Sequence, residues 1–171
     1  MYLNWMGKNR FFVEKMIQFA NMYAAVYKKE ELYGTEIPIS FEQVQVLEYL
    51  LENEQLNQNM AMIAQRLGIT PSNFTRIVNK LVKKGLLEKY YMEGNRKNII
   101  IRVTDSGREL YQTYSRYISE NIFSGLFEAS EEISEEVLHK IGEGMDRSLR
   151  KQKEQGQKTR LIPVEKENEV E

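Results

Sequence analysis

Residues 59–104 constrain the fold more than any other part of this chain. Their pattern predicts a short helix over 60–67, a second helix over 71–84, and two strands over 87–92 and 98–103. A helix, a turn, a second helix and a hairpin follow one another without a long linker. The segment therefore predicts a helix-turn-helix followed by a β-hairpin.

Specific residues mark the ends of the two helices. Gly68 supplies a stop for the first helix. Thr70 and Pro71 start the second, because a hydroxyl caps free N–H groups and proline suits the first helical position. Gly85 ends it. With helices expected on both sides, the fold class is mainly α with a small β-hairpin (α+β).

Helical patterns flank this segment on both sides. An apolar stripe predicts a long helix over 8–31, and Ser40 begins a capping-box pattern for the next helix. After the hairpin, Thr104 caps a helix expected to reach about Phe127. A final helix is expected over 131–152, with acids in its first turns and cations in its last.

The helix over 71–84 has two different faces. At about 100° per residue, its apolar side chains fall on one side of a helical wheel, and its other side carries no acid. Asn and Arg can bond bidentately to base edges, whereas lysines further along suit phosphates. The candidate base-reading residues are Ser72, Asn73, Thr75, Arg76, Asn79 and Lys80, and the candidate phosphate contacts are Lys83 and Lys84. The alternative is an ordinary amphipathic helix with a solvated polar face.

The hairpin carries cations at its tip. Asn95, Arg96 and Lys97 are expected in the link between the strands. Arginine is favoured in a narrow minor groove, where the negative potential is enhanced. An ordinary surface hairpin would also carry cations. Next to the helix-turn-helix, however, this hairpin predicts the wing of a winged helix that binds DNA.

The distribution of charge supports that interpretation. The whole chain has a net charge of −1, but residues 60–110 hold ten Lys/Arg against four Asp/Glu. This window therefore carries +6 and the remainder −7. Such asymmetry is typical of a nucleic-acid face on an acidic body.

Composition excludes several other classes. The chain has no cysteine and one histidine, so disulfides, cysteine-ligated metals and histidine clusters are excluded. We find no phosphate-binding loop, nucleophile elbow or metalloprotease motif, and we expect no enzyme, cofactor or metal. No apolar run is long enough for a signal peptide or a membrane span. We therefore expect a cytoplasmic protein without membrane contact.

Together these features resemble the MarR family of bacterial winged-helix transcription regulators, over about residues 8–150. The resemblance is carried by the turn Ile63-Ala64…Leu67-Gly68-Ile69, the helix Pro71-Ser72…Thr75-Arg76-Ile77-Val78, the segment Leu81-Val82-Lys83-Lys84-Gly85-Leu86-Leu87, and Thr104-Asp105-Ser106-Gly107 after the wing. The wing departs from the family pattern. Asn95-Arg96-Lys97 stands where an Asp-Arg-Arg portion is usual, which removes an acid that would orient the cations.

The resemblance implies a homodimer, usually a repressor, that binds a pseudo-palindromic operator. The first and last helices would dimerise through Phe12, Met16, Phe19, Ile133, Val137, Ile141 and Met145, although these stripes could also pack within one subunit. The expected parts are an N-terminal dimerisation helix at 1–35, a winged-helix DNA-binding domain at 36–104, C-terminal dimerisation helices at 105–153, and a disordered tail at 154–171.

Family members also bind small aromatic or lipophilic effectors between these parts. Tyr23, Tyr27, Phe41 and Tyr91 are candidates for such a pocket, and the alternative is that they are core residues. The function itself has one alternative, a winged-helix module that binds another protein and no DNA. That module would show acids or apolar residues on the exposed face of the 71–84 helix, and the sequence has none there.

Overall fold

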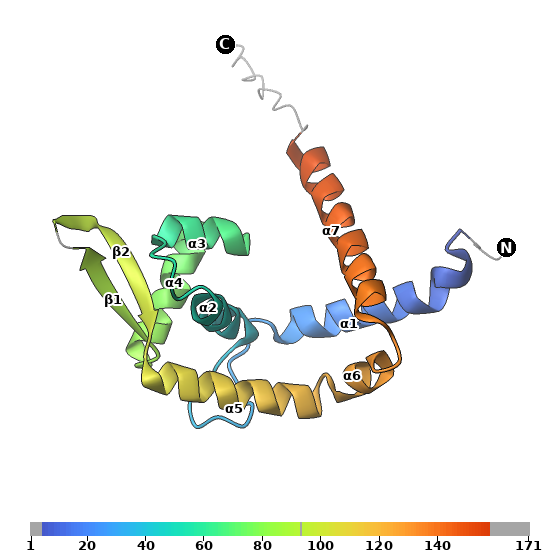
Figure 1. Ribbon diagram of the computed structural model, residues 1–171, viewed down its shortest axis with the longest axis horizontal. Helices are drawn as coiled ribbons and strands as arrows, with labels where there is room; N and C mark the ends of the chain where they lie inside the picture. The colour runs from blue at the N-terminus through green and yellow to red at the C-terminus, as the bar shows by residue number, and fades with distance from the viewer. Residues whose placement is uncertain (1–4, 93, 158–171) are drawn as a thin grey trace, which may run out of the picture. The chain divides into compact units, whose positions relative to one another are not determined.

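The computed structural model describes residues 5–92 and 94–157, which form two compact units. The first unit ends at Ile122 and the second begins at Phe123. The first contains the hairpin and five α-helices among its described residues (Figure 1). The two units are described separately below.

The first unit opens with a short 3₁₀ turn (η1, Gly7–Asn9) and helix α1 (Arg10–Val26). The expected helix over 8–31 is too long at its C-terminal end. Backbone N–H groups of Glu31 and Ile39 donate to each other's carbonyls at 3.1 and 2.9 Å, forming an isolated bridge. Tyr33 and Gly34 between them have positive φ angles, which a helix cannot contain. The chain therefore leaves the helix early to make a tight loop.

Helix α2 (Phe41–Glu52) lies at the centre of this unit. Ser40 and Gln43 form the expected capping box, with each side chain bonded to the other residue's backbone N–H. The helix packs against α4, α5 and strand β2. The elements that follow α2 in the sequence are therefore assembled around it.

The helix-turn-helix is confirmed. Helix α3 (Met60–Leu67) ends at Gly68, whose φ of 69° is left-handed, as predicted. Helix α4 (Pro71–Lys83) begins with the hydroxyl of Thr70 accepting from the N–H of Asn73. Both helices have the predicted boundaries to within one residue.

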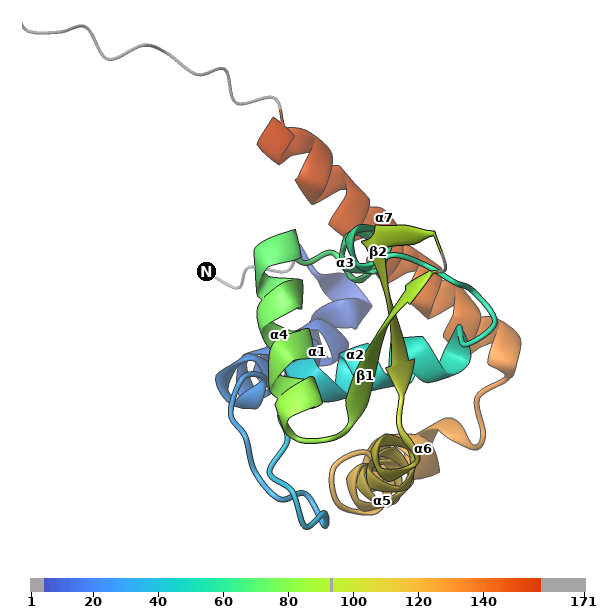
Figure 2. The same cartoon turned by 90° about the vertical axis from the view of Figure 1, so that its left-hand side faces the viewer.

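The wing consists of antiparallel strands β1 (Leu87–Met92) and β2 (Asn95–Val103). Figure 2 shows this hairpin beside α4. The expected link over 93–97 is too long, because β2 begins at Asn95 and Met92 pairs with it. Gly94 has a φ of 76°, which suits a two-residue hairpin turn. Asn95, Arg96 and Lys97 therefore belong to a strand.

Helix α5 (Asp105–Asn121) follows the wing and packs on α2. Thr104 caps it as predicted, accepting from the N–H of Gly107 at 3.0 Å. The helix stops before Phe127, because the backbone departs from ideal helical angles at Ile122 and Phe123. The side-chain amide of Asn121 also donates to a carbonyl of the last turn.

The second unit holds α6 (Ser124–Ser130) and α7 (Glu135–Gln157) among its described residues. Helix α7 begins later than the expected residue 131, with the hydroxyl of Ser134 accepting from the N–H of Val137 at 3.4 Å. It also includes residues 154–157, which were assigned to the tail. Residues 158–171 of that tail lie outside the described residues. No described helix is both long and apolar enough to cross a membrane.

Gly107, in the motif that follows the wing, lies where the backbone of α5 closely approaches the backbone before β1. A Cβ atom on Gly107 would come within 2.4 Å of the Leu86 carbonyl oxygen and 2.7 Å of Val103 Cγ1. No real Cβ tolerates such distances, so α5 would have to move away from the start of the wing. The motif therefore requires glycine for close approach of two backbones.

We predict that Gly107→Ala lowers the free energy of unfolding by about 1–3 kcal/mol, measured by urea denaturation. Gly142→Ala in α7 is the control, because an added Cβ meets nothing within 4 Å there. That control is expected to be neutral or to stabilise by up to about 1 kcal/mol, since alanine favours helix. An unchanged midpoint for Gly107→Ala would contradict the close packing of α5.

Candidate nucleic-acid interface

Helix α4 is fixed by one face and exposed on the other. Phe74, Ile77, Val78 and Leu81 are completely buried against neighbouring elements. The opposite side forms a shallow depression lined by Ser72, Thr75, Arg76, Asn79, Lys80 and Lys83. The structure thus brings together five of the six candidate base-reading residues and one of the two candidate phosphate contacts.

Arg76 on this face forms an ion pair and hydrogen bonds with neighbouring side chains. Its Nη2 lies 3.1 Å from Glu42 Oε2, and Glu42 comes from the start of α2, where its side chain is only 6% exposed. Asn73 joins the two, because its Nδ2 donates to Glu42 Oε1 at 2.9 Å and its Oδ1 accepts from Arg76. Half-buried Asn73 therefore contacts protein groups rather than lining the depression. Glu42 was not a candidate, since nothing in the sequence relates it to a residue 34 positions away.

A second acid, Glu30, accepts hydrogen bonds from lysines at the C-terminal end of α4. Lys84 donates to Glu30 Oε2 at 2.9 Å, to the Pro38 carbonyl at 2.6 Å and to Gln43 Oε1 at 3.0 Å. Its side chain is only 18% exposed. Lys84 is therefore turned inward, and the expectation that it contacts a phosphate is not supported by its position. Lys80, which remains on the exposed face, also reaches Glu30, at 3.3 Å.

The pKa of Glu30 reflects this cluster. Partial burial raises the pKa, but hydrogen bonds from Lys84, Gln43 and Lys80 outweigh it and hold the pKa below the ordinary value. Glu30 belongs to the loop after α1. The cluster therefore joins that loop to the C-terminal end of α4.

Other contacts hold individual residues on the exposed face of α4. Asn79 Oδ1 accepts a hydrogen bond from Lys89 of β1 at 2.6 Å, which links this face to the wing. Thr75 Oγ1 donates to the Pro71 carbonyl at 2.9 Å. Within the described residues, Lys83 forms no ion pair and no side-chain hydrogen bond, and the residue is exposed.

At the wing, Asn95 is exposed at the start of β2. The side chains of Arg96 and Lys97 lie outside the described part of the chain. The net charge of +6 over residues 60–110 also overstates the surface charge, because acids outside that window pair with its cations. Glu30 pairs with Lys80 and Lys84, Glu42 with Arg76, and Glu54 with Arg108.

Three of the four candidate effector residues lie together. Tyr23 has its ring centroid 5.6 Å from that of Tyr27 and 4.9 Å from that of Phe41. Tyr91 is not part of this group, because it sits on β1, is 62% exposed and lines a separate depression on the wing with Asn57 and Arg102.

Sequence reasoning missed three further rings of the same cluster. Tyr33 and Tyr114 both contact Phe41, and Tyr117 contacts Tyr33. The spacing of Tyr114 and Tyr117 on one helix face was the available signal. Burial raises the pKa of Tyr114, and burial together with a hydrogen bond to Glu48 raises that of nearby Tyr111 to about 12. These phenols therefore stay neutral at ordinary pH.

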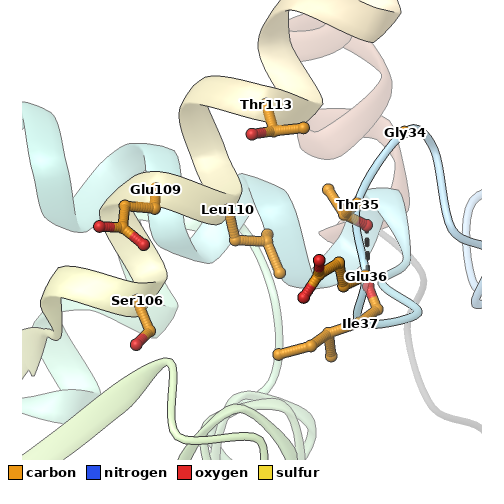
Figure 3. A pocket seen from close by; sticks show the side chains of 8 residues that line it. All are labelled: Gly34, Thr35, Glu36, Ile37, Ser106, Glu109, Leu110 and Thr113. Carbon is orange, nitrogen blue, oxygen red and sulfur yellow. Dashed lines mark hydrogen bonds between the residues drawn. The ribbon is translucent and has the colours of Figure 1, made fainter.

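A cavity of about 470 Å³ lies between the 34–37 loop and α5. Figure 3 shows Glu36 and Ile37 on the loop side and Ser106, Glu109, Leu110 and Thr113 on the helix side. None of the four candidate effector residues lines it. Its two carboxylates and three hydroxyls suit a polar occupant better than a lipophilic one.

Each unit also exposes an apolar helix face. Helix α1 contains no buried residue, and Phe12, Met16 and Phe19 are 39–50% exposed. In the second unit, Ile133, Val137, Ile141 and Met145 are 39–45% exposed. The structure therefore leaves every candidate dimerisation residue at the surface of its own unit. Sequence-based reasoning had left packing within one subunit as the alternative.

Comparison with known proteins agrees with this architecture. Residues 37–93 match the model of the MarR family. The chain is similar to the HTH-type transcriptional regulator PchR of Bacillus subtilis, with 26% identity over 81 residues, 47% of each chain. It spans about half the length of the curated relatives that it matches.

Solved structures share the fold over more of the chain. The MepR–DNA complex of Staphylococcus aureus aligns with a TM-score of 0.60 and 21% identity, covering 85% of this chain and 96% of that one. PcaV of Streptomyces coelicolor, solved with its natural ligand, aligns with a TM-score of 0.58 and 16% identity over 87% and 97%.

The matched residues hold the helix-turn-helix and the first wing strand, and the alignments with the two solved structures cover 85–87% of the chain. The chain therefore has the winged-helix fold of these structures, and its residues 37–93 match the MarR family of transcription regulators. This match confirms the resemblance inferred from the sequence over the helix-turn-helix and the first wing strand.

The Glu30 cluster gives a pH-dependent prediction. Because the folded state lowers the pKa of Glu30, its contribution to stability is present above the ordinary value of 4.5 and is lost as the pH falls below it. Wild type and Glu30→Gln should therefore differ in unfolding free energy at pH 7 and converge as the pH is lowered through 4.5. A difference that is constant across this range would show that the ion pairs of Glu30 do not stabilise the fold.

Proposed function

We propose that this protein is a transcription regulator, most simply a repressor, that binds double-stranded DNA sequence-specifically. The observation that carries the proposal is the exposed face of α4. Six polar or cationic side chains line one depression there, on a helix whose other face is completely buried. A rigid helix without an acid on its outer face is what the major groove accepts.

The residues have different expected tasks along α4. Ser72, Thr75 and Arg76 lie in the N-terminal half, from which such helices reach base edges. Lys83 would contact a phosphate, and its support is that it lies near the C-terminal end of α4 and forms no ion pair among the described residues. The wing would lie over the adjacent minor groove, and Arg96 would enter that groove.

We further propose that the protein acts as a homodimer on a pseudo-palindromic operator. The support is the set of large apolar side chains that α1 and α7 each expose on their own unit. A second copy would cover them. Dimerisation would also join two weak half-site contacts into one binding event.

We also propose that a small aromatic or lipophilic effector binds beside Tyr23, Tyr27 and Phe41. The supporting observation is that these rings gather next to the loop that carries Glu30, which is bonded to α4. PcaV, solved with its natural ligand, is a relative by fold. The interaction-module alternative has no comparable support, because the exposed face of α4 offers a partner neither acids nor an apolar patch.

We predict that Arg76→Ala weakens specific binding by about 1–3 kcal/mol and relaxes the preference at one base step. Lys83→Ala should instead weaken binding to all sequences alike and reduce the salt slope by about one. Fluorescence anisotropy on a selected duplex and on random duplexes, over a salt series, separates the two effects. Wild-type affinity for the selected duplex in both variants would mean that α4 does not enter the groove.

Phe12→Glu is predicted to dissociate the dimer, because it places a charge in the apolar stripe of α1. Light scattering should show wild type at twice the chain mass of 20.2 kDa and the variant near 20.2 kDa. Gln18→Glu is the matched control. It adds the same charge off the stripe, at a residue that bonds Lys15 on the helix surface, and should remain dimeric. A monomeric wild type, or a dimeric Phe12→Glu variant, would contradict the proposed interface.

A further inference from the structure

The carboxylate of Glu42 is buried, and its side-chain partners among the described residues all come from α4. Glu42 is the second residue of α2, where the free N–H groups and the helix dipole favour a negative charge. Its side chain is 6% exposed, so the charge needs a close partner. Arg76 and Asn73 provide it from the adjacent helix.

The contacts of Asn73 leave it little capacity to read a base. Its Oδ1 accepts from Arg76 Nε at 3.2 Å and from Nη2 at 2.6 Å, which occupies both lone pairs. Its Nδ2 donates to Glu42 Oε1. A bidentate bond to adenine would require Asn73 to release the other two residues.

Arg76, in contrast, keeps an open edge. Its Nε and Nη2 face Asn73 and Glu42, whereas no hydrogen bond or ion pair among the described residues engages Nη1. The side chain remains 48% exposed and lines the depression on α4. The guanidinium is therefore held through Nε and Nη2, and its open edge is the Nη1 group, whose two N–H groups lie in the guanidinium plane.

We propose that Glu42 is a positioning residue for DNA readout: with Asn73 it fixes the guanidinium plane of Arg76, so that its open edge reads a guanine. This role rests on the proposed DNA-binding function. Arginine bonds guanine through two N–H groups in one plane, so its orientation determines whether a base or a phosphate is contacted. The nearby carboxylate also weakens the attraction of Arg76 for phosphates, since it neutralises the cation.

Glu42 should therefore increase specificity more than affinity. Arg76 can stay paired while its open edge meets DNA, so binding does not leave a buried carboxylate without a partner. Without the carboxylate, Asn73 alone would hold the arginine, which could then turn to bond the nearest phosphate. The affinity for non-specific DNA would therefore rise, and the affinity for the specific site would fall.

The test is Glu42→Gln, which keeps the size of the side chain and removes its charge. The ratio of affinities for a selected duplex and a random duplex is expected to fall about tenfold. Binding to random DNA should tighten, with a salt slope steeper by about one. Glu30→Gln is the matched control, because it removes another acid that bonds α4, at Lys80 and Lys84, and should leave the ratio unchanged.

Each alternative outcome overturns the proposal in a recognisable way. An unchanged ratio in Glu42→Gln, with only thermal stability reduced, would assign Glu42 a structural role. An equal increase in affinity for both duplexes would mean that Glu42 only neutralises the charge of Arg76 and does not orient it. An equal loss of selectivity in Glu30→Gln would show a general charge effect. A wild-type chain that selects no sequence would instead overturn the proposed function, and the role of Glu42 with it.

A second readout needs no DNA. In the free wild-type protein, the Arg76 Nε–H signal in nuclear magnetic resonance should exchange slowly with solvent and show restricted motion. Glu42→Gln should release it. Asn73→Ser, at a partly exposed position, tests the same contact if Glu42→Gln does not fold. A signal that is already freely mobile in the wild type would overturn the positioning role.

Discussion

The burial of one face of α4 is the constraint on which the rest of the structure depends. Phe74, Ile77, Val78 and Leu81 leave no exposed surface, and they lock the helix onto α2, α3 and β1. Burial of four such side chains contributes on the order of 6–12 kcal/mol before conformational entropy is counted. The polar face is rigid because the apolar face is fixed, and the wing is placed by the same contacts.

Acids from distant parts of the chain then determine how the cations of α4 behave. Glu42 holds Arg76 from α2, and Glu30 holds Lys80 and Lys84 from the loop after α1. Lys83 remains a solvated charge. A helix that looks uniformly basic in the sequence therefore carries three kinds of cation: one oriented by a buried acid, two shared with one acid, and one free among the described residues.

The sequence predicted the elements built from local chemistry. The cap at Thr70, the stop at Gly68 and the capping box at Ser40 depend on residues a few positions apart, and all three are confirmed. Where pairing between backbone segments decides, the predicted boundaries were wrong. The bridge between Glu31 and Ile39 shortened α1, and the pairing of Met92 with Asn95 extended β2 into the expected tip. The inward contacts of Lys84 could not be predicted either, because its partners lie 41–54 residues away in the sequence, and its contact with a phosphate stays a prediction.

The most direct measurement is a selection of binding sites from random double-stranded DNA with the purified full-length chain, followed by hydroxyl-radical footprinting of the winner. We predict a two-fold symmetric consensus with a guanine in each half-site and two protected segments one helical turn apart. An absence of enrichment, or a single asymmetric footprint unaffected by Arg76→Ala, would contradict it.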